Sequence, residues 1–459
     1  MKTKSKLLVV APVMVLAACG APQYTGETLE NEVRALAQVS ASSAQARSTA
    51  SKLTGGFKAD ITRAVGATPE YLAALGAAAE ARHLVTVSEA ARKPQLETSA
   101  NLGSMVERGA GLASQTTNGA SANLSLRQVI YDGGLSSAMI DGAQASALVA
   151  LTEAEIVANR TAREAGATWV DLHALQARED ALTALMVKAT EMLGQMETLV
   201  ASGMIDKSAS TSADIAVRSL VLEKSQIDAS KAATTALYIK QFGAAPKALS
   251  APPALLTEAD LAKIKRDWST APILLQSAAQ VLSAKQALLA AQGREKPTVG
   301  LSAGVSSPMD RDEQTNLALG FEVRWILGDG GRRKADTAAK AARLEATEQA
   351  LEGLKLAGKS ELDTALSQRA ALRESLVTLA AQEVSAAKEI EILWSQLATG
   401  QTSVRQLIDA EVNSYRTTDR KILAQAELAK LELEMLASSG LLARKLGLSA
   451  QNAPMKATK

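Results

Sequence analysis

Two stretches of the chain share one pattern: PQLETSANL at residues 94–102 and PTVGLSAGV at residues 297–305. After each proline, apolar and more polar side chains alternate. Alternation with a period of two predicts a strand with one apolar face. A second alternating run follows each stretch, at residues 122–126 and 319–325. Each stretch therefore opens a predicted β-hairpin of about ten-residue strands.

The hairpins belong to a duplicated sequence. Pro69 and Pro94 are 25 residues apart, and so are Pro272 and Pro297, which sets the two halves 203 residues apart. Each proline pair encloses a helical stretch. We therefore expect each half to contain a helix, then a hairpin.

Similar turns close the two hairpins: YDGG at residues 131–134 and GDGG at residues 328–331. Here the offset is 197 residues, so the first hairpin loop is expected to be six residues longer. Asp132 and Asp329 suit a strand-to-helix turn, since their carboxylates can cap free N–H groups.

Long helical patterns follow the turns. Residues 136–200 contain no proline, and breaks come at Gly203 and at Gly400, again 197 residues apart. From Asp132 to Gly203 a helix would be roughly 105 Å long. A helix of this length suits a duct that crosses a compartment better than a globular domain.

Heptad spacing flanks both breaks and predicts antiparallel coiled-coil hairpins. The apolar residues spaced by seven are Val377 and Val384; Ala380, Ala387 and Trp394; Ile390 and Leu397; and Ala213, Leu220 and Ile227. Near the end of the second half, Gly447 is matched with Gly243 of the first.

Composition excludes several classes of protein. The chain has 459 residues, 50 basic and 48 acidic, and this balance offers no electrostatic basis for nucleic-acid binding. Aromatic residues make up 3%, too few for a thick core, while the abundant alanine favours helices. His83 and His173 have no partners at metal-ligand spacing. We therefore predict no enzyme activity, no cofactor and no metal.

The N-terminus resembles a bacterial lipoprotein signal. Three lysines among the first six residues precede an apolar run at 7–16, and LAACG follows at 16–20. Cys19, the only cysteine, is the predicted lipid-attachment site. Because Gly20 follows it rather than aspartate, the resemblance indicates the outer membrane. The alternative is an ordinary signal peptide with a chance cysteine.

Strands of this length match those that cross outer membranes. Four strands cannot close a barrel, so a membrane-spanning sheet requires a dimer with eight strands or a trimer with twelve. The alternative is a soluble sandwich of the two hairpins. Tyr131 and Trp325 close their strands, either at the lipid–water interface or in packing at the sheet–helix junction.

Together these features resemble the TolC-like outer-membrane efflux family, over roughly residues 57–448. The resemblance depends on the strand starts at Pro94 and Pro297, on the Asp-Gly-Gly turns and on GQTSVRQLIDA at 400–410. It implies a mainly helical chain with a small β part. It also implies a homotrimer with a twelve-stranded barrel, four strands per chain, continued by a long periplasmic α-helical barrel.

The resemblance further implies a function and partners. The chain would be a lipid-anchored exit duct in the outer membrane for a tripartite efflux or type I secretion system. It would conduct substrates passively from a periplasmic adaptor protein and an inner-membrane transporter. The alternative is a periplasmic coiled-coil adaptor, or a structural lipoprotein without a pore. The sequence identifies neither the cargo nor the pump.

The same resemblance assigns a periplasmic gate to Asp409, Arg405 and Gln406. Three copies of Asp409 would form an acidic ring that selects cations. Arg405 lies one helical turn earlier and can pair with Asp409. Gln406 stands where the family often has an aspartate. The alternative is a solvated helix pair.

Residues at the two helical tips are expected to contact the adaptor. They are Gly203, Asp206, Lys207 and Ser208 in the first half, and Gly400, Thr402 and Ser403 in the second. The alternative is an ordinary polar turn between helices. Since only the second tip carries the gate-like Asp409, gating is expected to be concentrated there.

The predicted domain organisation follows from these features. It comprises a signal peptide (1–18); a lipid-anchored arm (19–56); a first repeat (57–243) with hairpin 95–131 and tip near 203; a linker (244–266); a second repeat (267–448) with hairpin 298–327 and tip near 400; and a disordered tail (449–459).

Overall fold

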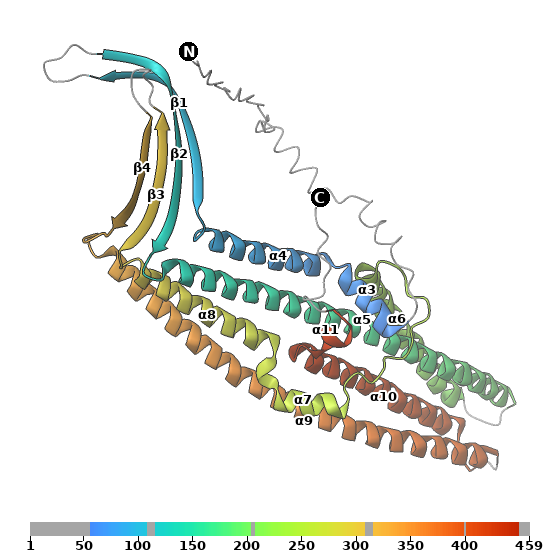
Figure 1. Cartoon of the computed structure of the whole chain (residues 1–459). Coiled ribbons are helices and arrows are strands. Elements are labelled where there is room, and N and C mark those ends of the chain that lie inside the picture. Colours follow the sequence, from blue (N-terminus) through green and yellow to red (C-terminus); the bar gives the residue numbers. More distant parts are fainter. Residues whose placement is uncertain (1–55, 108–114, 203–206, 308–314, 399–400, 449–459) are drawn as a thin grey trace, which may run out of the picture. The chain divides into compact units, whose positions relative to one another are not determined.

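A computed structural model describes five stretches of the chain (Figure 1): 56–107, 115–202, 207–307, 315–398 and 401–448. All of them lie in one compact unit that spans residues 51–459.

Three predicted segments fall on residues outside these stretches. They are the signal peptide (1–18), nearly all of the arm (19–56) and the tail (449–459). Cys19 lies there too, so the lipid anchor stays a prediction.

Helices and strands follow one another as a duplicated sequence requires. Their bounds are α3 Phe57–Gly66, α4 Pro69–Ala90, β1 Gln95–Glu107, β2 Gln115–Tyr131, α5 Leu135–Ala201, α6 Lys207–Phe242, α7 Glu258–Arg266, the 3-10 helix η1 Trp268–Thr270, α8 Pro272–Gly293, β3 Thr298–Ser307, β4 Asn316–Arg324, α9 Arg332–Ala398, α10 Val404–Ser438 and α11 Leu441–Lys445.

The repeated prolines mark element starts. Pro69 and Pro272 occupy the first turns of α4 and α8, where the missing N–H costs nothing because it has no intrahelical partner. Pro94 and Pro297 immediately precede β1 and β3, so each helix ends before a residue that cannot extend it.

The Asp-Gly-Gly turns cap the long helices as predicted. Asp132 accepts hydrogen bonds from the backbone N–H groups of Gly134 at 3.1 Å and Ser136 at 2.8 Å. Asp329 accepts from the N–H groups two and four positions later, at 3.2 and 3.1 Å. Gly133 and its repeat counterpart Gly330 both have φ of +69°, which L-residues rarely adopt.

The four strands form one antiparallel sheet in the order β1-β2-β3-β4. Its register places most of the large apolar side chains of the four strands on one face and most of the polar side chains on the other. The apolar face includes Leu96, Leu124, Leu301, Val305, Leu317, Leu319, Phe321 and Val323. All of these except Leu301 are largely exposed, among them Leu317 at 79% and Phe321 at 73%.

The predicted difference in loop length falls on residues 108–114 and 308–314, which lie outside the described stretches, so it stays a prediction. The described strands are longer in the first hairpin: β1 has 13 residues and β2 has 17, against 10 in β3 and 9 in β4. The first hairpin therefore extends beyond the second. The second hairpin also ends early, since β4 stops at Arg324 rather than at 327.

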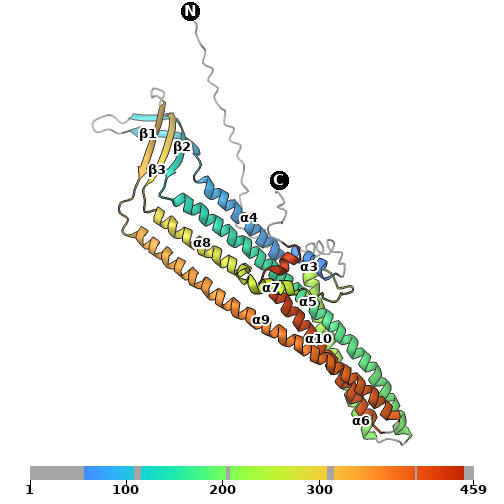
Figure 2. The ribbon, with the colours of Figure 1, turned by 60° about the horizontal axis from the view of Figure 1, so that its bottom comes forward.

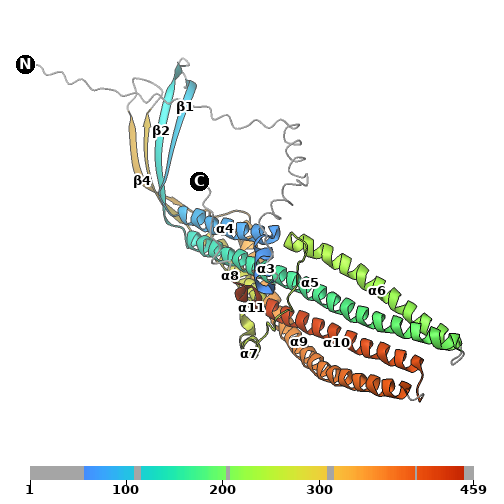
Figure 3. The ribbon, with the colours of Figure 1, turned by 90° about the vertical axis from the view of Figure 1, so that its right-hand side faces the viewer.

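The helices form one layer whose order matches that of the strands. Beside the sheet the order is α4-α5-α8-α9 (Figure 1). Farther from the sheet it is α6-α5-α10-α9, as Figure 3 shows. Thus α5 and α9 run the full length of the layer (Figure 2). α4 and α6 lie one after the other beside α5, and α8 and α10 lie one after the other between α5 and α9.

The main core lies where these shorter helices meet. Phe57 of α3, Trp169 of α5, and Tyr238 and Phe242 of α6 pack as an aromatic cluster, with ring centroids 4.1–6.0 Å apart. Burial, reinforced by the nearby charge of Asp60, raises the pKa of Tyr238 to about 12. This cluster joins the first helix of the unit to both arms of the first helical hairpin.

The predicted linker at 244–266 contains a helix, α7, which belongs to the second repeat. Adding the 203-residue offset to α3 gives 260–269, which overlaps α7. A capping box starts α7: Asp260 N–H donates to Thr257 Oγ1 at 3.2 Å, and Thr257 N–H donates to Asp260 at 2.9 Å. The second repeat therefore begins near 258, not 267.

The predicted match of Gly447 with Gly243 is also wrong. Gly243 follows α6 with φ of +78°, and Gly440 follows α10 with φ of +75°, at the 197-residue offset of the turns. Gly440, rather than Gly447, is the counterpart of Gly243.

Some of the predicted heptad residues lie in contacts between helices, and others are exposed. Leu220 and Ile227 are buried between α6 and α5, and Ile390 packs between α9 and α10. Val377 and Val384 do not contribute to the α9–α10 contact: they are 72% and 56% exposed. Their heptad row lies on the other side of α9.

Substituting Gly133 tests how closely the first Asp-Gly-Gly turn packs against Lys296 and Gly293. A Cβ at Gly133 would lie 2.6 Å from Cβ of Lys296 and 3.1 Å from the Gly293 carbonyl oxygen, whereas one at Gly330 meets nothing within 4 Å. Gly330→Ala should lower the unfolding free energy by about 1–2 kcal/mol through its positive φ alone. Gly133→Ala should cost more. Thermal unfolding followed by circular dichroism compares them, and equal losses would contradict the predicted clash.

Candidate functional site

The second helical tip is organised by Gln406. Ser403 and Gln406 form a capping box: Gln406 N–H donates to Ser403 Oγ at 3.3 Å, and Ser403 N–H donates to Gln406 Oε1 at 3.2 Å. Thr402 Oγ1 donates to the same Oε1 at 2.6 Å. The predicted gate residue Gln406 and the predicted adaptor contacts Thr402 and Ser403 thus share one local network that starts α10.

Arg405 and Asp409 stand together on the exposed side of this first part of α10. Arg405 Nε lies 3.9 Å from Asp409 Oδ2, and the side chains are 62% and 68% exposed. The predicted proximity is therefore present in the chain. Such an exposed pair adds little to stability, so its significance depends on what these groups face.

The other side of α10 is anchored to α5. Val404, Leu407 and Ile408 are buried in one apolar cluster with Met192 and Met196 of α5. The second helical hairpin is therefore held against the first at the end where Asp409 projects.

Farther along, polar side chains connect α10 to the first hairpin. Lys188 of α5 lies 3.3 Å from both carboxylate oxygens of Glu411, which is buried. Tyr415 Oη donates to Glu223 of α6 at 2.9 Å. Burial and this hydrogen bond raise the pKa of Tyr415, so it remains a neutral donor.

One further ion pair links the same helices. Arg178 of α5 contacts Asp419 of α10 through Nε at 2.5 Å and Nη2 at 3.4 Å. None of these links is indicated by the sequence. Their partners are about 190 to 240 residues apart in the chain, so no local pattern indicates them.

The first tip is only partly described. Gly203 and Asp206, like Gly400 of the second tip, lie outside the described residues. Lys207 and Ser208 open α6, but their side chains are among those not described. Adaptor contact by these residues stays a prediction.

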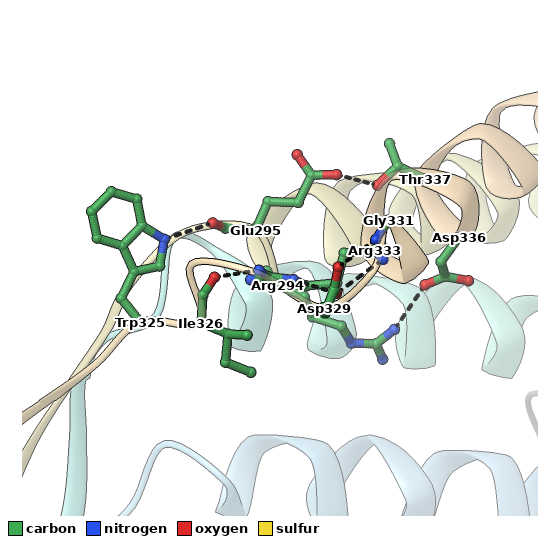
Figure 4. Close-up of polar contacts among 9 residues, drawn as sticks. All are labelled: Arg294, Glu295, Trp325, Ile326, Asp329, Gly331, Arg333, Asp336 and Thr337. Atoms are coloured by element: carbon green, nitrogen blue, oxygen red, sulfur yellow. Dashed lines mark hydrogen bonds and ion pairs between the residues drawn. The ribbon is translucent and has the colours of Figure 1, made fainter.

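The junction between the second hairpin and the helices is held by Arg333 (Figure 4). Its guanidinium contacts Asp329 at 2.9 Å and donates to the carbonyl oxygens of Arg294 at 3.0 Å and Ile326. Desolvation opposes ionisation of Asp329, but the hydrogen bonds from Arg333 and Gly331 prevail and lower its pKa. One arginine thereby ties α9 to α8 and to the end of the sheet.

The two aromatic residues at the strand ends are exposed in the single chain. Tyr131 ends β2 beside a bulge and is 50% exposed. Trp325 is 59% exposed, and its indole N–H donates to the Glu295 carbonyl at 3.3 Å (Figure 4). Trp325 therefore contacts the junction while most of its ring remains accessible.

Charged residues occupy the polar face of the sheet near its helical end. Glu97 of β1, Arg127 of β2, and Glu322 and Arg324 of β4 share this face by register, and Arg324 pairs with Glu322 at 2.7 Å. The sheet thus has one face suited to lipid and one suited to water.

No group of His, Cys, Asp and Glu in the described part of the chain could hold a metal ion. Among the described helices, none combines the length and apolarity that a membrane crossing requires.

Comparisons with known proteins agree with this architecture. Residues 268–441 match the family model described as outer membrane efflux protein. No curated protein sequence matches the chain.

Solved channels share the fold over both halves. The CmeC outer membrane channel of Campylobacter jejuni is 13% identical, with a TM-score of 0.74, and the match covers 87% of this chain and 90% of CmeC. The outer membrane protein VceC of Vibrio cholerae is 16% identical, with a TM-score of 0.74, covering 84% and 96%. The open-state MtrE outer membrane channel of Neisseria gonorrhoeae is 13% identical, with a TM-score of 0.70, covering 84% and 88%.

The chain thus has the mainly helical fold of the outer-membrane efflux channels, with one small four-stranded sheet. The predicted resemblance to the TolC-like outer-membrane efflux family is confirmed.

Replacing the junction arginine should weaken the link between sheet and helices. Arg333→Ala removes hydrogen bonds to two carbonyl oxygens and to Asp329, and should lower the unfolding free energy by about 2 kcal/mol. Arg332→Ala is the matched control, since that exposed side chain has no hydrogen-bond or ion-pair partner among the described residues. Thermal unfolding of the two variants provides the comparison. A similar effect of both would show that Arg333 does not hold the junction.

Proposed function

We propose that three copies of this chain form a channel through the outer membrane, which serves as the exit duct of a tripartite efflux or type I secretion system. The observation that carries this proposal is the sheet. It exposes a continuous apolar face, presents polar side chains on the other face, and has two edge strands, β1 and β4, without partners in the described chain.

The two open edges support assembly. A bilayer core offers no water to unpaired backbone groups, so a spanning sheet has to close on itself. Four strands are too few, and about eight are the practical minimum. Three copies provide twelve strands, as the family resemblance implies, with the apolar faces toward lipid and the polar faces toward a water-filled lumen.

The helices extend this lumen into the periplasm. The 67 residues of α5 span about 100 Å, and α9 has the same length. Because the helices follow the order of the strands, closing the sheet into a barrel also closes the helical layer into a tunnel. The tips near 203 and 400 then lie farthest from the membrane, where a periplasmic adaptor and an inner-membrane transporter would dock.

The second tip is the proposed gate. Apolar packing of Val404, Leu407 and Ile408 on α5 leaves Asp409 on the opposite, exposed side of α10. Three symmetry-related Asp409 carboxylates around one axis would create a negative ring that favours cations. Arg405 would moderate this charge.

Electrical recording tests the channel directly. Purified protein reconstituted in a planar bilayer should give a heat-resistant trimer on gels and discrete conductance steps. A stable trimer that never conducts would contradict the channel and favour the alternative, a periplasmic coiled-coil adaptor or structural lipoprotein.

The gate has its own test. Asp409→Asn should reduce the preference for cations over anions in reversal-potential measurements, because it removes three negative charges from one ring. Glu389→Gln on α9 removes the same charge from an exposed carboxylate that has no ion-pair partner in the described chain. Equal selectivity of the two variants would exclude Asp409 from the constriction.

The lipid anchor predicted at Cys19 is tested by metabolic labelling. The chain should incorporate radiolabelled palmitate, and Cys19→Ser should abolish this incorporation while sparing the trimer, since the membrane-spanning strands lie elsewhere. Labelling of the Cys19→Ser protein would refute acylation at this residue.

A further inference from the structure

α10 carries two arginines whose charges are not compensated by any described residue. Arg416 and Arg420 lie one helical turn apart and are both exposed, and neither makes a hydrogen bond or an ion pair within the described part of the chain. Like charges at this spacing repel each other and weaken a helix by a small amount. Stabilisation of α10 therefore does not explain why the two arginines are there.

The other charged side chains in this part of α10 are all paired. Between residues 411 and 421 the pairs are Glu411 with Lys188, Asp419 with Arg178, and Lys421 with Glu383. Each pair joins α10 to a neighbouring helix, which is α5 for the first two and α9 for the third. Arg416 and Arg420 are thus the net positive charge of this section of the helix.

Helix geometry places both arginines on the face that carries Asp409. Seven residues complete almost two turns, so Arg416 lies nearly in line with Asp409, about 10 Å farther from the tip, and Arg420 follows one turn later. The buried side chains Ile408 and Tyr415 lie on a different side of α10, against the first helical hairpin. In the proposed channel Asp409 faces the lumen, so Arg416 and Arg420 line the lumen behind it.

The basic pair occurs in the second repeat only. At the 197-residue offset of the turns, the first repeat has Ser219 and Glu223 instead. On the face that carries Asp409, the next charged side chain toward the sheet is the exposed Glu427, seven positions after Arg420. Three copies would therefore bring six guanidinium groups into one short section of the lumen, with acidic side chains before and after it.

We propose that Arg416 and Arg420 bind the anionic groups of solutes that pass through the duct. A guanidinium group can donate two parallel hydrogen bonds to a carboxylate, a sulfonate or a phosphate. Asp409 favours cations at the tip, and the arginines hold anionic groups about 10–16 Å farther along. This inference rests on the proposed channel and adds the class of its cargo, which is solutes that carry an anionic group.

Block of the channel current tests the arginine site. Inorganic tripolyphosphate is added in steps to the protein conducting in a planar bilayer, and the concentration that halves the current is measured. The double variant Arg416→Gln/Arg420→Gln should raise this concentration at least about tenfold, because it removes six guanidinium groups from the trimer. Its preference for cations in reversal-potential measurements should increase, opposite to the change expected for Asp409→Asn.

Two further variants serve as controls. Lys388→Gln removes the same charge as Arg416→Gln at a similar distance from the tip, but the exposed Lys388 lies one turn from Val384, on the side of α9 away from α10. It should leave the block unchanged. Arg416→Lys/Arg420→Lys keeps the charge without the planar donor pair, and should weaken the block less than the double glutamine variant.

The outcomes separate this inference from the channel itself. If the double glutamine variant conducts and is blocked at the original concentration, the arginine site is wrong and the channel stands. The same conclusion follows if tripolyphosphate never blocks the unmodified channel, or if Lys388→Gln weakens the block as much as Arg416→Gln. Should the double variant fail to assemble, this comparison of single variants decides. If the unmodified protein trimerises but never conducts, the proposed function fails first.

Discussion

The unpaired N–H and C=O groups along β1 and β4 are the constraint on which the structure depends. The described residues of one chain provide no strand to pair with them, and the exposed apolar face of the sheet cannot remain in water. The proposed channel solves both problems at once, since its sheet edges pair with other copies inside a membrane. The helical layer repeats the arrangement, because its order follows the strands and each outer helix has one face that no other described helix covers.

Much of this fold could be predicted from the sequence because its signals are local. A proline before a strand, a period of two and an Asp-Gly-Gly turn each act within a few residues. The structure bears this out at Asp132 and Asp329, whose carboxylates cap α5 and α9. Duplication strengthened the interpretation, since each weak signal occurred twice at nearly the same spacing.

Some features that the sequence did not indicate depend on contacts between residues far apart in the chain. Others depend on a choice between two structures that fit the same residues. The greater length of the first hairpin fits a longer loop or longer strands equally well, and the described part of the chain has the longer strands. Glu411 and Asp419 look like ordinary charges of a helix until α5 brings Lys188 and Arg178 beside them. By contrast, the capping box of Ser403 and Gln406 was visible in the sequence, where Gln406 was considered only as a gate residue.

The unequal continuity of the helices has a mechanical consequence. In each chain α5 and α9 are single rods of 67 residues, whereas the remaining sides of the layer are interrupted between α4 and α6, and between α8 and α10. An uninterrupted helix bends gently but does not fold at one point. A movement at the tips would therefore pivot at the interruptions near Gly243 and Gly440, and the two stiff rods would transmit it as a change of tilt to the base of the sheet.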